Sequence, residues 1–126
     1  MTTTVPCRWE FGGVTYEVDA PCFSSDGVDD LVPGEDVERA EHACVYAALC
    51  DGIDDPVTLS FARRSIGIEK AMMAGRLDLP VDAFLDIENN RENIVRASYV
   101  YLLRKLVKLS DRGGFVVRRV GSTASP

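Results

Sequence analysis

The sequence predicts an α+β fold, in which a small antiparallel sheet packs on three to four helices. Two alternating runs flank a Gly-Gly pair in "CRWEFGGVTYEV", which is typical of a tight hairpin over residues 7–18. Apolar residues then recur at helical spacing through residues 37–110. A short strand, residues 115–120, follows a second Gly-Gly pair and is most simply added to the hairpin. The 126 residues are enough for one domain, with tails at residues 1–5 and 121–126.

The hairpin has a predicted register. If Phe11 pairs with Val14, then Trp9 faces Tyr16, and alternation places six side chains on one face: Cys7, Trp9, Phe11, Val14, Tyr16 and Val18. On the other face Arg8 lies opposite Glu17. Because an isolated hairpin is marginal in water, we expect the apolar face to cover the helices.

Residues 20–36 combine Pro, Gly, Ser and acidic residues, which indicates a surface loop. From Val37 the pattern becomes helical, with apolar residues around most of the circumference, so we expect this helix to be buried on more than one side. The next helix begins with Asp55 as N-cap and Pro56 at its first position. Gly67 kinks or splits it, but Ile66 and Ile68 continue its apolar stripes, which argues against a helix-turn-helix.

A short helix is predicted around residues 82–88, and Asn90 is placed to cap the last helix. Helical angles put its apolar residues on one broad side, namely Ile94, Val95, Tyr99, Leu102, Leu106 and Leu109. The cations Arg104, Lys105, Lys108 and Arg112 fall on the other side. Gly113 or Gly114 is expected to end the helix.

The net charge of −6 conceals a strong asymmetry along the chain. Residues 1–60 hold 13 acidic and 2 basic side chains, whereas residues 61–126 hold 7 acidic and 12 basic ones. Such asymmetry favours electrostatic docking, either within the chain or onto a charged partner. The predicted basic surface is Arg104, Lys105, Lys108, Arg112, Arg118 and Arg119, and the predicted acidic surface is Asp26, Asp29, Asp30, Glu35 and Asp36.

The motifs of catalysis and metal binding are missing from the sequence. Cys7, Cys22, Cys44 and Cys50 lack the spacing of a zinc site, and "DGVDD" lacks the ligand pattern of an EF-hand. His42 has no nucleophile tied to it by spacing. The glycine pairs lack the downstream residues of a phosphate loop. We therefore expect a protein that is not an enzyme and has no catalytic residue, metal or cofactor.

The compartment is also an expectation. No apolar run approaches the roughly 20 residues that span a bilayer, and the first residues lack the features of a signal peptide. The sequence therefore predicts a cytoplasmic protein without membrane contact, and its cysteines are expected to be reduced.

A basic helix, a glycine break and a strand over residues 91–120 resemble the end of a winged-helix DNA-binding domain. That resemblance implies a DNA-binding regulator, in which the C-terminal helix and following strand contact nucleic acid. A chain rich in acid repels phosphate, and residues 91–120 provide no second wing strand. Nucleic acid is therefore the alternative partner.

The order of "WEFGGVTYEV", "RAEHACVYAAL" and "RENIVRASYVYL" is similar to the layout of tail assembly chaperones from long-tailed phages. This resemblance implies a role in keeping tape-measure or tail-tube subunits soluble during tail assembly. We therefore expect a non-catalytic protein-binding assembly or regulatory module that acts through a charge-polarised surface. The sequence leaves open whether the chain forms a homo-oligomer.

Overall fold

A computed structural model describes residues 2–25, 28–31, 34–111 and 113–122. Within them lie four strands, β1 Thr2–Phe11, β2 Val14–Ser25, β3 Val28–Leu31 and β4 Arg118–Ser122. The helices are α1 Gly34–Cys50, α2 Pro56–Ser65, α3 Lys70–Arg76, α4 Val81–Asn89 and α5 Arg96–Leu109. The α+β class is as predicted, although the described residues form five helices rather than three or four.

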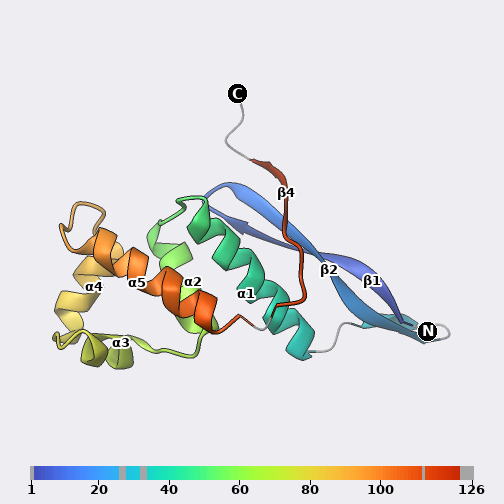
Figure 1. Ribbon diagram of the computed structural model, residues 1–126, viewed down its shortest axis with the longest axis horizontal. Coiled ribbons are helices and arrows are strands. Elements are labelled where there is room, and N and C mark those ends of the chain that lie inside the picture. Colours follow the sequence, from blue (N-terminus) through green and yellow to red (C-terminus); the bar gives the residue numbers. More distant parts are fainter. Residues whose placement is uncertain (1, 26–27, 32–33, 112, 123–126) are drawn as a thin grey trace.

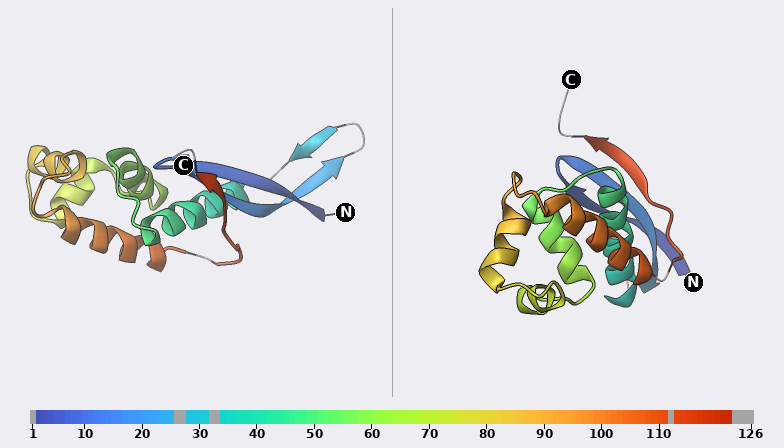
Figure 2. Two further views of the ribbon diagram at one scale, coloured as in Figure 1. Left: turned by 90° about the horizontal axis from the view of Figure 1, so that it is seen from above. Right: turned by 60° about the vertical axis from the view of Figure 1, so that its left-hand side comes forward.

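The sheet is organised around β2. β1 pairs antiparallel with β2 over ten residues, while β3 and β4 pair with the two ends of its other edge. α1 packs along β1 and β2, and Figures 1 and 2 show α3 and α4 at the end of the molecule farthest from the N-terminus. The predicted addition of the C-terminal strand to the hairpin is confirmed, because β4 pairs with β2.

The predicted hairpin register is confirmed residue by residue. Phe11 pairs with Val14, and Trp9 pairs with Tyr16. The apolar face covers the helices as expected, since Phe11 and Tyr16 are buried and Trp9 is packed against the core. The turn requires glycine, because Gly12 has a φ of 57° and a Cβ there would lie 2.6 Å from Cγ2 of Ile53.

The prediction of a loop over residues 20–36 was wrong. β2 continues to Ser25, β3 follows, and α1 begins at Gly34, before the expected Val37. Ala20 is buried in line with Tyr16, so the alternation of the hairpin extends further than its turn-forming neighbours suggested. Pairing with β1 therefore outweighs the local turn preference of Pro21. Similarly, residues 2–5 and 121–122, which the sequence assigned to tails, lie in β1 and β4.

The prediction for α1 is confirmed, because residues on two of its sides are buried, among them Ala40, Cys44, Val45 and Leu49. The start of α2 is also confirmed. Asp55 accepts a hydrogen bond from the backbone N–H of Thr58 at 3.1 Å, and Pro56 is the first helical residue.

Gly67 separates α2 from α3 completely. It has a φ of 75° and its N–H donates to the carbonyl of Arg64, while the N–H of Ile68 donates to the carbonyl of Arg63. These two bonds form a Schellman motif, which ends a helix. The prediction that the apolar stripes continue through Gly67 from Ile66 to Ile68 was therefore wrong, because α2 ends at Ser65.

The ends of α5 also differ from the prediction. The helix begins at Arg96 because the side chains of Asn90 and Asn93 accept backbone hydrogen bonds from Glu92 and Val95, which stabilises a turn instead. It ends at Leu109, four residues before Gly113, and the strand after it is shifted from residues 115–120 to Arg118–Ser122.

The buried face of α5 is not centred where the sequence placed it. The buried residues are Arg96, Tyr99, Leu103 and Val107. Of the predicted apolar side, Leu102 and Leu106 are half-buried, while Val95 is 46% and Leu109 82% exposed. The apolar part of the helix is therefore broader than the part that this fold covers.

A charged network lies in the core between α2, α4 and α5. The guanidinium of Arg63 donates to both carboxylate oxygens of Glu88, with Nε–Oε2 and Nη2–Oε1 distances of 3.0 and 3.2 Å. The hydroxyl of Tyr99 donates to the same carboxylate at 2.7 Å. Burial and this hydrogen bond raise the pKa of Tyr99. Every oxygen of the carboxylate thus has a donor, as a buried charge requires.

Candidate functional site

The predicted basic surface is divided between two places in the structure. Arg118 on β4 forms salt bridges with Glu17 and Asp19 on β2, and Arg119 lies 3.4 Å from the carboxylate of Asp51 at the end of α1. These two arginines therefore join the C-terminal strand to the acidic half of the same chain. Their positive charge is largely balanced where it lies.

The salt bridges of Arg118 lower the pKa values of its partners, Glu17 and Asp19. Hydrogen bonds from Arg118, and then from Arg8, hold the pKa of Glu17 below its ordinary value of 4.5. Arg118 likewise lowers the pKa of Asp19 below 3.8. Since both folded-state values are depressed, the stabilisation is fully present above the unfolded values and is lost as the pH falls through the folded ones.

We expect Arg118→Ala to lower the melting temperature at pH 7 and to have little effect near pH 2. Protonation of Glu17 and Asp19 removes their attraction to Arg118 in the unsubstituted protein as well. The melting temperatures of the two proteins therefore converge below pH 4. Thermal unfolding followed by circular dichroism across this range measures the difference. Lys70→Ala, at an exposed position on α3, is the control. A gap between the melting temperatures that persists unchanged at low pH would contradict the assignment.

The cations of α5 form the second part of the predicted basic surface. Lys105 and Lys108 are exposed, Arg104 is half-buried, and Arg112 lies outside the described residues. The Lys105 ammonium lies 4.6 Å and the Arg104 guanidinium 5.7 Å from the centre of the Tyr101 ring. α5 thus presents an exposed aromatic ring with two cations beside it.

The structure describes only part of the predicted acidic surface. Asp26 lies outside the described residues, and Asp29 and Asp30 belong to β3, where the structure describes the backbone but not these side chains. Glu35 and Asp36 occupy the first turn of α1, where acid complements the helix dipole. Asp36 is also paired with Arg39 at 3.3 Å.

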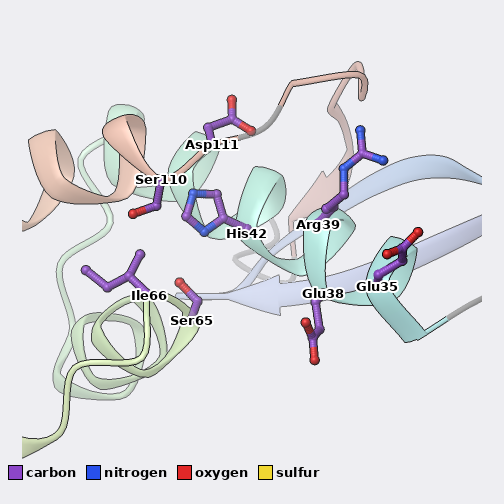
Figure 3. A pocket seen from close by; sticks show the side chains of 8 residues that line it. All are labelled: Glu35, Glu38, Arg39, His42, Ser65, Ile66, Ser110 and Asp111. Atoms are coloured by element: carbon purple, nitrogen blue, oxygen red, sulfur yellow. The ribbon is translucent and has the colours of Figure 1, made fainter.

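A small polar pocket of about 220 Å³ lies beside His42. Figure 3 shows the imidazole ring of His42 directed toward the ends of α2 and α5. Its Nε2 lies 2.6 Å from the carbonyl oxygen of Val107, so Nε2 carries the proton and donates it. The hydroxyls of Ser65 and Ser110 donate to carbonyls of their own helices. The ring thus ties α1 to α5, and neither serine hydroxyl is engaged with it. In the part of the chain that the structure describes, no cluster of three metal-ligating side chains occurs.

A mostly apolar groove lies between α4 and α5. It has a volume of about 560 Å³ and is lined by Leu77, Leu79, Ala83, Asp86, Ile87, Asn93, Val95, Ser98, Tyr99 and Leu102. This size lies within the range of ligand-binding clefts. We call it the α4–α5 groove.

The α5 side of this groove continues beyond it. Val95, Leu102 and Leu109 are spaced seven residues apart, so they follow one line along the helix with a drift of only about 20° per interval. Ile94, the residue before Val95 in the turn that leads into α5, is 95% exposed. An elongated apolar strip thus extends the floor of the groove toward the C-terminal end of α5.

Sequence reasoning missed this site, although the signal was available. Six apolar residues were placed on one broad side of the last helix, and nothing in the pattern indicated which part of that side the fold covers. The fold covers Tyr99 from this side together with a neighbouring face, through Leu103 and Val107. The excess of apolar residues over what one buried face needs was the sign of a second contact surface.

Comparison with known proteins adds no relative. A scan against models of protein families gave no match, and neither the curated proteins nor the solved structures contain a match. Among the described residues, no helix has both the length and the apolar character to cross a bilayer.

Proposed function

We propose that this protein is a non-catalytic protein-binding module, and that the α4–α5 groove is its binding site. The observation that carries the proposal is the apolar line of Val95, Leu102 and Leu109 beside a groove of about 560 Å³, in which Val95 and Leu109 are exposed and Leu102 is half-buried. Apolar surface that is contiguous and framed by polar residues marks sites of protein interaction. The exposed cations of α5 lie next to this line and add charge to the same surface.

An assembly or regulatory role follows from this kind of site. A protein that shields apolar segments of other proteins needs an open apolar groove and a charged surround that keeps the complex dissolved. The resemblance to phage tail assembly chaperones is one specific form of this proposal, in which the segments belong to tail subunits.

Site-specific photo-crosslinking in the source cells tests the proposal. A photoreactive residue at Ser98, which is exposed and lines the groove, is expected to join the protein to another polypeptide. The same residue at Glu10, exposed on β1, is the matched control and is expected to give no such product. Leu102→Asp should abolish the product from Ser98, because a charge then lies in the apolar floor. Equal products from both positions, or none from Ser98, would contradict the proposal.

Nucleic-acid binding is the second candidate, and the exposed Tyr101 ring beside Arg104 and Lys105 is the observation that favours it. An exposed aromatic ring beside cations provides stacking and charge for a nucleic acid. Against it, Arg118 and Arg119, which a wing would use, are paired with acids.

A labelled DNA duplex, titrated across a salt series, separates the two candidates. If the protein binds DNA, affinity falls steeply with salt, and the slope is shallower when Arg104, Lys105 and Lys108 are all changed to alanine. For the protein-binding module we expect no binding to DNA at 150 mM salt.

A further inference from the structure

We infer that the α4–α5 groove accepts an amphipathic helix whose two flanks carry opposite charges, basic along α4 and acidic along α5. The inference rests on the proposed function and specifies the chemistry of the partner. It follows from the shape of the groove, from the line of apolar residues along α5, and from the charges on its two lips.

The shape of the apolar surface favours a helix. Val95, Leu102 and Leu109 extend over about 21 Å at 1.5 Å per residue, and their seven-residue spacing is the spacing at which two packed helices meet repeatedly. Ala83 on the facing side of the groove is small, which allows a helix to approach α4 closely. A partner helix of about four turns would cover the line.

The lips of the groove differ in charge. On the α4 side, Asp86 lines the groove and Asp82 lies one turn before it, both exposed. On the α5 side, Lys105 lies about 60° around the helix from Leu102, at 100° per residue, and Lys108 follows one turn later. Asp82 and Asp86 therefore lie beside the first turns of α5, whereas Lys105 and Lys108 lie farther along α5 on the other side of the apolar line. A helix bound along this line meets acid on one flank and base on the other.

A second copy of this chain fits the groove less well. If two α5 helices packed antiparallel about a two-fold axis, Val95 of each would meet Leu109 of the other. The same symmetry places the Lys105 and Lys108 flanks of both copies on one side of the interface, where they repel. A partner with an acidic flank instead neutralises this side.

Opposite charges on the two lips also fix the direction of the bound helix. A helix with lysines on one flank and glutamates on the other satisfies both lips in one orientation only. If the flanks are exchanged, the helix must turn end for end to satisfy them. Direction is therefore a property that the charges alone control.

The experiment uses two 18-residue helical peptides with leucine at every a and d position of the heptad. One peptide has lysines on the first flank and glutamates on the second, and the other has them exchanged. Each carries a nitroxide at its N-terminus and is added to the ¹⁵N-labelled protein. A peptide of the same composition in scrambled order is the control.

We expect both amphipathic peptides to shift the amide signals of Ala83, Val95 and Leu102, and the scrambled peptide to shift none. The nitroxide should broaden signals near Val95 with one peptide and near Leu109 with the other. Asp82→Lys neutralises the acidic lip and leaves the contacts of Asp86 with Asn90 and Asn93 in place. It should weaken binding about two- to fivefold, the range of exposed ion pairs, and reduce the preference for one direction. Glu38→Lys on α1 should change neither.

Three results would overturn the inference. If neither amphipathic peptide binds, the groove does not accept a helix. If both bind without a preferred direction, the charges on the lips do not determine how the helix is oriented. A product from Ser98 in the crosslinking experiment would then still support the proposed function. If sedimentation shows a dimer that Leu102→Asp dissociates, a second copy occupies the groove.

Discussion

Replacing Glu88 with alanine is expected to lower the free energy of unfolding by about 3–5 kcal/mol, the cost of breaking a buried ion pair by removing one partner. The guanidinium of Arg63 is 2% exposed and would lose the carboxylate that accepts two of its hydrogen bonds. Tyr99 would lose its acceptor as well. Urea unfolding measures the change, and Glu92→Ala, at an exposed position four residues later, should stay within about 0.5 kcal/mol.

A double substitution separates the charge from the packing. Arg63→Met with Glu88→Leu removes both ions and keeps similar volumes, so we expect it to recover much of the stability that Glu88→Ala loses. If the double variant were less stable than Glu88→Ala, the network would contribute more than its own desolvation cost and our account would be wrong.

The second large effect distinguishes the two faces of α5. Leu103→Ala is expected to cost about 2–5 kcal/mol, because Leu103 is fully buried and its removal leaves a cavity. Leu109→Ala makes the same chemical change in the same helix at an 82% exposed position and should stay within about 0.5 kcal/mol. Denaturant unfolding of both variants measures the contrast. A cost for Leu109→Ala as large as that for Leu103→Ala would mean that Leu109 is packed in the fold as well, and would contradict the assignment of the two faces.

Local signals in the sequence were sufficient for the elements they define directly. The Gly-Gly turn and the alternation around it determine the hairpin register, since a one-residue slip would bring Arg8 to the apolar side in place of Trp9. Asp55 and Pro56 mark the start of α2 because each has a physical role at that position. Residues of this kind act on their immediate neighbours, so no knowledge of the rest of the fold is needed.

The remaining errors arise where distant residues decide the outcome. β2 extends past Pro21 because β1 pairs with it, and α5 turns its Leu103 inward because α1, α2 and α4 surround that face. The candidate site depends on the same long-range packing. A pattern shows that Val95, Leu102 and Leu109 form a line, but only the packed structure shows that the fold leaves Val95 and Leu109 exposed at its two ends.

The return of β4 to β2 has a consequence for the order of folding events. The salt bridge of Arg118 with Glu17 joins residues that are 101 positions apart. Contacts between residues so far apart require the closure of a long loop, and they form late unless nearby contacts have already brought the segments together. The hairpin and α1 provide those nearby contacts. We therefore expect β4 to add to a sheet that has already formed, so that substitutions at Arg118 accelerate unfolding and leave the rate of folding almost unchanged.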